Sequence, residues 1–309
     1  MQTLARIGID YLPSYFSVGE FYMLNREIAA LLLCPQCRQG GLDTSCVEEN
    51  GRMLHGSLIC DSCRATYAVE EGIPHLKPGV MENDPEWETW RNHLDGFAAR
   101  RALRSTILSS PREERWSRKM QAFGDFVKVP NGRILDVGCG PGNLRKILDP
   151  QRVTYFGIDP LPVEEVEEFP FVCAVAESIP FRAGTFTSVV VRSALDHFLD
   201  LNTFFEEVAR VLTDDGQVFI EQVVHKSSGL DGFVRDSLHT VKDLIDGVRT
   251  LKQRKSAPKH MREFSQESLM RAVEHGGFEV TRSQAHHSDW YTPTQMFFNL
   301  CRRDRKLDC

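Results

Sequence analysis

The sequence contains no apolar run long enough to cross a lipid bilayer. Its longest run, residues 28–33, falls far short of the roughly 20 residues that a transmembrane helix needs. The N-terminus also lacks a basic start, an apolar segment and a small-residue cleavage site in the order that marks a secretory signal. We therefore expect a cytoplasmic protein.

The sequence also has no excess of basic residues. The 37 Lys and Arg residues are outnumbered by 43 Asp and Glu residues, and the net charge of −6 does not favour a general binder of polyanions. Two stretches are nevertheless basic: residues 91–119 hold eight Lys/Arg against three acids, and residues 242–262 hold seven against two. Such stretches are typical of solvated helix faces, and the alternative is a positive rim that attracts an anionic substrate.

The chain has nine cysteines, an odd number, and four of them form two CxxC pairs. In a reducing compartment this pattern indicates a metal site rather than disulfides. Four thiolates predict a closed, structural, tetrahedral Zn²⁺ site, with iron as the alternative ion and metal-free redox pairs as the alternative chemistry. The expected ligands are Cys34, Cys37, Cys60 and Cys63. Cys46 and His55 lie in the gap between the pairs, where we expect a hairpin and assign them no role in binding the metal.

A glycine-rich turn with an acidic residue downstream predicts a nucleoside-binding site. The apolar residues around Ile134 indicate a buried parallel strand, and a helix is expected to start at Leu144. Three glycines between them can bring backbone N–H groups close to a ligand; they are Gly138, Gly140 and Gly142. Asp159 follows a second apolar run, 21 residues after Gly138, where a carboxylate can accept hydrogen bonds from ribose hydroxyls.

Asp136, two positions before the first glycine, would repel a pyrophosphate but suits a ligand that carries an ammonium and a sulfonium. Here the sequence resembles the class I S-adenosylmethionine-dependent methyltransferases, whose first motif is similar to residues 134–142. Three later stretches are also similar to that family: residues 176–181, 195–200 and 204–216. The resemblance implies S-adenosylmethionine as the cofactor, with contacts from Asp136, Gly138, Cys139, Gly140, Gly142, Asp159, Ala176, Glu177 and Arg192.

One position departs from that family. Its members often have Asp where this chain has Val175, and that Asp meets the adenine amino group. We therefore expect adenine recognition to depend on backbone groups or on Glu177.

The cysteine-containing stretch carries a second resemblance. Residues 58–76 resemble the small zinc-ribbon activator family that partners tRNA, rRNA and protein methyltransferases. Residues 34–78 hold six Asp/Glu against four Lys/Arg, so this module is a poor nucleic-acid binder by itself.

The two resemblances together predict an α/β fold. We expect a Rossmann-like, seven-stranded methyltransferase sheet with helices on both faces, plus a small N-terminal Cys₄ zinc ribbon. Strands are expected at 133–137, 153–158, 171–175, 186–192 and 217–224, with a closing hairpin at 278–283 and 295–301. The expected parts are an N-terminal helical segment (1–33), the ribbon (34–78), a helical linker that covers the cofactor (79–128) and the methyltransferase domain (129–309), with a helical substrate lid at about 226–262.

Two histidines are candidate catalytic residues. His197 follows the fourth strand, where the resemblance places the cofactor's methyl group, and it is either a general base or a residue that shapes the pocket. Asp196 and Asp200 are near enough in sequence to orient it. His260 precedes a later helix in a run similar to one in small-molecule methyltransferases, and is the second candidate.

Four functions remain in competition, and one of them is methylation of a protein. The favoured one is O- or C-methylation of a small molecule, a sugar or a lipid-linked intermediate. The alternative is methylation of an RNA base, with the ribbon and the basic helices binding the RNA, although the Asn/Asp-Pro-Pro-Tyr motif of amino-group methylation is missing at residues 192–195. The last is a scaffold that keeps the fold without catalysis.

Overall fold

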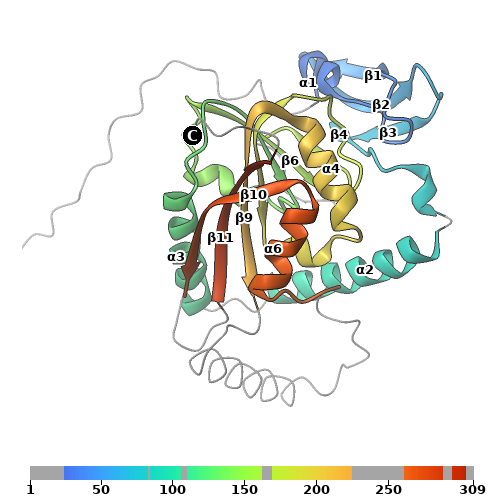
Figure 1. Cartoon of the computed structure of the whole chain (residues 1–309). Coiled ribbons are helices and arrows are strands. Elements are labelled where there is room, and N and C mark those ends of the chain that lie inside the picture. Colours follow the sequence, from blue (N-terminus) through green and yellow to red (C-terminus); the bar gives the residue numbers. More distant parts are fainter. Residues whose placement is uncertain are drawn as a thin grey trace, which may run out of the picture.

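The computed structural model describes residues 24–82, 84–105, 110–161, 169–224, 261–287 and 294–303, apart from the side chains of residues 97–117. These residues form two β-sheets with helices around the larger one (Figure 1). Most of the expected substrate lid, His260 and the start of the N-terminal segment lie outside the described residues. None of the described helices is both long and apolar enough to span a membrane.

The smaller sheet contains the CxxC pairs. Helix α1 (Arg26–Leu31) precedes it, with Asn25 as N-cap. Its four antiparallel strands follow one another in order; they are β1 (Leu42–Glu49), β2 (Arg52–Cys60), β3 (Thr66–Glu70) and β4 (Ile73–Pro74). The hairpin expected between the two pairs is therefore confirmed, and we call residues 34–76 the ribbon.

The larger sheet has seven strands in the order β10-β11-β9-β8-β5-β6-β7. Its parallel part consists of β5 (Gly132–Val137), β6 (Val153–Asp159), β7 (Phe171–Cys173), β8 (Phe186–Arg192) and β9 (Leu212–Val224). β10 (Phe278–His286) and β11 (Thr294–Arg302) form an antiparallel hairpin that pairs with β9. The predicted α/β class, the seven-stranded sheet and the closing hairpin are confirmed.

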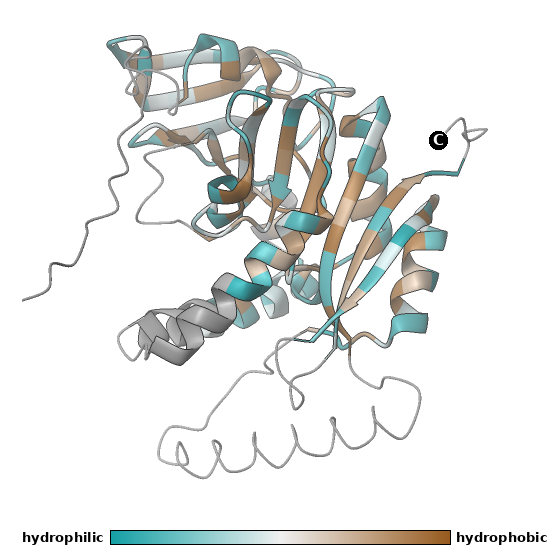
Figure 2. Ribbon diagram, turned by 90° about the vertical axis from the view of Figure 1, so that its left-hand side faces the viewer, coloured by the Kyte–Doolittle hydropathy of each residue, from teal (hydrophilic) through white to brown (hydrophobic). Residues whose placement is uncertain are grey.

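Helices cover both faces of this sheet, because its central strands are apolar on both sides (Figure 2). Helix α3 (Ser110–Phe126) packs on one face through Phe123 and Phe126, against Phe297 of β11. Helices α4 (Leu201–Val211) and α6 (Gln266–His275) pack on the other (Figure 1). Ser265 caps α6 in a capping box with Ser268.

Helix α2 (Pro85–Ser105) follows a short 3₁₀ turn, η1 (Gly79–Glu82), and joins the ribbon to the larger sheet. Trp90 and Leu94 on α2 pack with Met81 and Val175 in a small separate core. Val175, which replaces the family's Asp, is therefore a buried apolar contact for α2.

The ribbon packs directly on the larger sheet. Leu76 N donates to Cys173 O of β7 at 2.8 Å, and Leu33 N donates to Pro180 O at 3.0 Å. Apolar side chains of the ribbon belong to the same core as β5, β6, β8 and α4. The two sheets therefore share one continuous hydrophobic core.

Two sequence-based expectations are wrong in detail. The helix expected from Leu144 is only a short 3₁₀ turn, η2 (Asn143–Ile147), because Leu148 is already extended and Pro150 follows two residues later. The strand expected at 278–283 continues to His286, whose ring stacks on that of Phe297 with 5.6 Å between the ring centroids.

Candidate functional site

The glycine turn after β5 forms one wall of a cavity of about 410 Å³. Gly138 N and Cys139 N both donate to Ile158 O, at 2.8 and 3.1 Å, which closes the turn against β6. Gly138 has φ +73°, and a Cβ there would come within 2.6 Å of Ala194 Cβ. Gly142 has φ +67°, and its Cβ would meet the Phe169 ring at 2.3 Å. Both positions therefore require glycine.

Most of the predicted cofactor residues line this cavity. They are Gly138, Cys139, Gly140, Asp159, Ala176, Glu177 and Arg192. The structure adds side chains of helix α2 and of the segment after β8, among them Trp90, Leu94, Ser193 and His197. Gly142 shapes the turn, and neither Gly142 nor Asp136 lines the cavity.

Asp159 ends β6 and holds the glycine turn in place. Its Oδ2 accepts a hydrogen bond from Gly140 N at 2.9 Å, and its Oδ1 accepts one from Leu161 N at 2.9 Å. A carboxylate oxygen has more than one lone pair, so these bonds leave capacity for ribose hydroxyls in the cavity.

Asp136 is buried, with 2% of its surface exposed. Its Oδ2 accepts a hydrogen bond from Tyr155 Oη at 2.6 Å, whereas Oδ1 has no hydrogen-bond partner among the described residues. Burial raises the pKa of Asp136 to about 6. A buried acceptor without a partner is costly, and a cationic group of a bound ligand would satisfy it. This observation fits the ammonium of S-adenosylmethionine.

Arg192 belongs to a buried ionic network. It donates from Nε to Glu221 Oε2 at 2.9 Å, and Glu221 also pairs with Lys119 of α3. Lys119 Nζ reaches Ser193 Oγ at 3.2 Å, and Ser193 has φ +49° where β8 ends. Of these residues, Arg192 and Ser193 line the cavity. Arg192 is thus engaged by Glu221, which the sequence reasoning missed.

Ala176 and Glu177 also line the cavity. Glu177 Oε1 accepts hydrogen bonds from Leu199 N at 2.6 Å and from Asp200 N at 3.2 Å, which ties this loop to the segment before α4. Its Oε2 is buried and has no hydrogen-bond partner among the described residues. Burial raises the pKa of Glu177. We expect Oε2 and the backbone here to meet the adenine.

His197 ends the short 3₁₀ turn η3 (Leu195–His197) after β8 and lines the cavity. Its Nδ1 lies 2.9 Å from Nε2 of His93, a buried residue of α2 that sequence reasoning missed. Asp196 Oδ1 lies 4.0 Å from its Nε2. Asp200 does not orient His197, because its side chain caps α4 by accepting from Asn202 N and Thr203 Oγ1.

The four cysteines of the two CxxC pairs come together at one end of the ribbon. All four sulfurs lie within 4.8 Å of one another, with 3.7 Å between Cys34 and Cys63 and 3.6 Å between Cys37 and Cys60. Zinc–sulfur bonds of about 2.3 Å give sulfur–sulfur distances of about 3.8 Å in a tetrahedron, so the cluster fits a Zn²⁺ ion. Backbone N–H groups of Gly40 and Gln39 lower the pKa of the Cys37 thiol to about 6.

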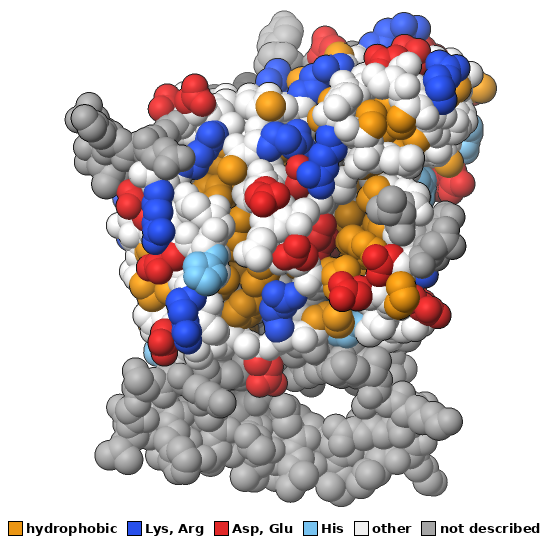
Figure 3. All heavy atoms as spheres, turned by 45° about the vertical axis from the view of Figure 1, so that its right-hand side comes forward, with side chains coloured by type: hydrophobic (Ala, Val, Ile, Leu, Met, Phe, Trp, Pro, Cys, Tyr) orange, Lys and Arg blue, Asp and Glu red, His pale blue; other side chains and the backbone are white. Residues whose placement is uncertain are grey.

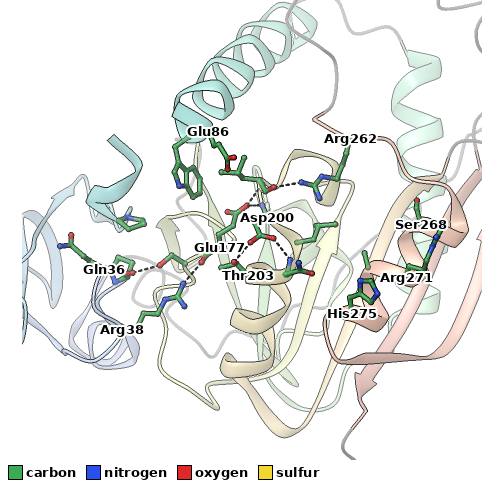
Figure 4. A pocket seen from close by; sticks show the side chains of 18 residues that line it. Gln36, Arg38, Glu86, Glu177, Asp200, Thr203, Arg262, Ser268, Arg271 and His275 are labelled. Carbon is green, nitrogen blue, oxygen red and sulfur yellow. Dashed lines mark hydrogen bonds between the residues drawn. The ribbon is translucent and has the colours of Figure 1, made fainter. Parts of the chain in front are cut away.

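A second, larger cleft of about 850 Å³ lies where the ribbon meets helices α4 and α6 (Figure 4). Glu177 borders both this cleft and the cofactor cavity. Arginines line it from three elements: Arg38 of the ribbon, Arg262 before α6 and Arg271 on α6. Glu86, Glu177 and Asp200 line it too, so its charge is mixed. Figure 3 likewise shows acidic and basic side chains interspersed over the described part of one face.

Comparison with known proteins identifies the family of the larger sheet. A family model described as a methyltransferase domain matches residues 108–283. The human mitochondrial ubiquinone biosynthesis O-methyltransferase is 32% identical over 105 residues, which covers 29% of this chain and 28% of that protein. The uncharacterized methyltransferase YcgJ of Bacillus subtilis is 29% identical over 145 residues, covering 43% of this chain and 51% of that protein. The chain thus spans at most about half the length of these two relatives.

Among solved structures, YcgJ of Bacillus subtilis superposes with a TM-score of 0.44 and 18% identity, over 61% of this chain and all of that one. The family match begins after the ribbon, so the resemblance of the ribbon to the activator family stays a prediction. The match covers more than half of the chain and includes the glycine turn, Asp159 and the segment after β8. This chain therefore belongs to the methyltransferase-domain family.

Proposed function

We propose that this protein transfers a methyl group from S-adenosylmethionine to a small molecule. The observation that carries the proposal is the buried Asp136 carboxylate, whose Oδ1 has no hydrogen-bond partner among the described residues, two positions before the glycine turn that lines the cavity. A cationic, nucleoside-containing ligand satisfies that carboxylate, the backbone N–H groups of the turn and Asp159 together.

The residues of the cavity would bind and orient S-adenosylmethionine, and they would exclude water. Asp136 would hold the ammonium, Asp159 the ribose hydroxyls, and the loop at Ala176 and Glu177 the adenine. When bound, S-adenosylmethionine supplies an electrophilic methyl group. Trp90 and Leu94 of α2 exclude water from the cavity, and this alignment is the protein's main contribution to the rate.

The names of the relatives support a small-molecule acceptor. One is an O-methyltransferase of ubiquinone biosynthesis, and another, from Geotalea daltonii, is a C-methyltransferase of ubiquinone/menaquinone biosynthesis that is 28% identical over 142 residues. We infer that the acceptor here is a small or lipid-linked molecule methylated on oxygen or carbon. His197 is the proposed general base when the acceptor is a hydroxyl group; His260 remains a second candidate outside the described residues.

We also propose that the ribbon holds a structural Zn²⁺ ion through Cys34, Cys37, Cys60 and Cys63. The sulfur–sulfur distances and the N–H groups that point at the sulfurs support this, because four thiolates leave no open position for a substrate. A cytoplasmic location stays a prediction of the sequence.

The test is to incubate the purified chain with methyl-labelled S-adenosylmethionine and a fractionated cell extract. We expect label in the small-molecule or lipid fraction, and less label with Asp159→Ala at a cofactor concentration near the wild-type dissociation constant. Ribonuclease-sensitive label would mean that the acceptor is RNA and not a small molecule. Failure to bind S-adenosylhomocysteine would overturn the proposed enzyme and favour a scaffold.

A further inference from the structure

His93 and His197 come from elements that are 104 residues apart in the chain. Helix α2 places the His93 ring against the segment after β8, with 2.9 Å between His93 Nε2 and His197 Nδ1. The ring centroids are 5.2 Å apart and the ring planes differ by 33°. His93 is 2% exposed, so the contact lies inside the protein.

Helix α2 makes a second contact with His197. Trp90, one turn before His93, donates from Nε1 to the backbone oxygen of His197 at 2.8 Å. His197 N donates to Ala194 O at 2.9 Å, which closes the turn η3. Trp90 and His197 both line the cofactor cavity. Helix α2 therefore holds His197 at two points, its backbone oxygen and its ring nitrogen Nδ1.

Two imidazole nitrogens at 2.9 Å can share only one hydrogen. One ring must donate and the other must accept, because two N–H groups facing each other repel. The contact therefore couples the tautomers of the two rings: when His197 carries its proton on Nδ1, that nitrogen donates to His93 Nε2, and Nε2 of His197 is left able to accept a proton. Asp196 Oδ1, 4.0 Å from Nε2, acts on the other nitrogen of the same ring. The proton position on His197 is thus set between a residue of α2 and a residue of η3.

We propose that His93 is the positioning residue of His197, and that the two rings form one proton-holding pair for a hydroxyl acceptor. This inference rests on the proposed function. With the His197 proton on Nδ1, donated to His93 Nε2, the acceptor's hydroxyl proton moves to Nε2 of His197 as its oxygen gains the methyl group, and the positive charge lost by the sulfonium appears on the imidazolium of the pair. The pair thereby favours O-methylation, since a histidine base suits the removal of a hydroxyl proton.

The first test measures the proton position directly. The whole chain is labelled with ¹⁵N at histidine and saturated with S-adenosylhomocysteine, and the ring nitrogens of His197 are assigned with His197→Gln. Wild type is expected to show one tautomer. His93→Gln, whose amide reaches the place of Nε2, should keep it, whereas His93→Leu should give a mixture. His93→Asn is too short to reach and replaces the leucine variant if that one does not fold.

His275→Gln is the matched control, because His275 is exposed on α6 and outside the cofactor cavity. It should leave the His197 signals unchanged. Affinity for S-adenosylhomocysteine should stay within about twofold in every variant. Identical His197 nitrogen shifts in wild type and His93→Leu would overturn the proposal.

The second test measures turnover with the labelled extract fraction. Loss of a positioned general base typically slows transfer by about 10²–10⁴-fold, so His93→Leu should fall at least tenfold, and His93→Gln should recover part of the loss. Changed shifts with unchanged turnover would also overturn the positioning role. If the chain transfers no label at all, the proposed function fails, while the ring spectra still decide whether His93 fixes His197.

Discussion

The four-stranded ribbon and the seven-stranded sheet of this chain are stabilised by different means. The sheet buries many large side chains completely, and the largest of them are phenylalanines on β8, α4, β9 and β11. The ribbon buries few, and its first strand, β1, has no fully buried residue. Small sheets rarely bury enough apolar surface to fold alone. We infer that metal binding by the four cysteines stabilises the ribbon, as the aromatic core stabilises the sheet.

The two regions are nevertheless joined at the cofactor cavity. Pro35, inside the first CxxC pair, accepts a hydrogen bond from Ser178 Oγ at 2.8 Å. Arg38, directly after that pair, donates to Glu177 O at 3.0 Å and pairs with Glu207 at 3.4 Å. The loop expected to bind adenine therefore rests on the turn that holds the first CxxC pair. The comparison teaches that a region with its own means of stabilisation can still be part of a binding site.

The largest expected effect is that of removing the metal. Structural zinc contributes on the order of 10 kcal/mol in small zinc domains, so a chelator should abolish the hydrogen-exchange protection of β1–β4 and leave that of β5–β11. Cys60→Ser should act like the chelator. Cys46→Ser, in the same sheet but outside the cluster, should leave the bound zinc unchanged. Persistent protection of the ribbon without metal would mean that its apolar contacts are enough.

The second prediction addresses the sheet alone. Phe205 of α4 is fully buried, its ring lies 5.6 Å from that of Phe278, and a Cβ on Gly276 would come within 2.4 Å of it. Phe205→Ala should lower the free energy of unfolding by about 3–5 kcal/mol in urea titrations and leave the zinc content unchanged. Val47→Ala, at a residue 61% exposed on the ribbon, should change it by less than about 0.5 kcal/mol. A lower zinc content in Phe205→Ala would contradict the separation of the two regions.

The third prediction concerns the cavity. Asp159→Ala removes the acceptor of two backbone hydrogen bonds and the proposed ribose ligand. It should weaken the binding of S-adenosylhomocysteine by about 1–3 kcal/mol in calorimetric titrations. Asp149→Ala is the control, because Asp149 also accepts a backbone N–H but in an exposed turn outside the cavity. Equal affinities of the Asp159 variant and wild type would remove Asp159 from the site.

Much of the fold could be predicted from the sequence, because the strands of a parallel sheet are buried on both faces and form short apolar runs. Residues 133–137 and 186–192 were predicted on that basis, and the structure has strands there. The 3₁₀ turn η2 was predicted as a longer helix because its residues alone favour one. Pro150, which follows the turn, prevents the helix from continuing. The strand expected to end at 283 continues to His286, because the length of a paired strand depends on its partner strand.

The residues of the site were easier to predict than their partners. The glycine turn, Asp159 and His197 lie next to apolar strands, which is a local signal. Tyr155 with Asp136, and Glu221 with Arg192, are contacts between strands, and no local pattern reveals them. Two signals could have been used. Glu221 is a charged residue within an apolar strand, and His93 lies three residues after Trp90, on the same face of a helix.

The fourth prediction uses the pKa of Asp136, which burial raises to about 6. The carboxyl group is protonated below that pH and ionised above it, and an ammonium ligand requires the ionised form. Affinity for S-adenosylhomocysteine should therefore be constant above about pH 7 and fall about tenfold by pH 5. Asp136→Asn should bind more weakly at pH 7 and lose this dependence between pH 5 and 7. A wild-type affinity that does not change over this range would exclude Asp136 as the ammonium ligand.

The smallest expected effect tests the junction of the two regions. Arg38→Ala removes the bond to Glu177 O and the pairing with Glu207, and Arg38 is 42% exposed, so solvent screening limits the loss. We expect affinity for S-adenosylhomocysteine to fall about two- to tenfold, or roughly 0.5–1.4 kcal/mol, with the zinc content unchanged.

Arg26→Ala is the matched control for that variant, because Arg26 pairs with Glu48 on the exposed side of the ribbon, away from the cavity. Its affinity should equal that of wild type. The pair of variants separates two interpretations of the ribbon. If Arg38→Ala binds the cofactor as wild type does, the ribbon only packs against the sheet. If the affinity falls while zinc stays bound, then the metal-binding turn supports the adenine loop through this side chain, and loss of the metal must also weaken the cofactor site.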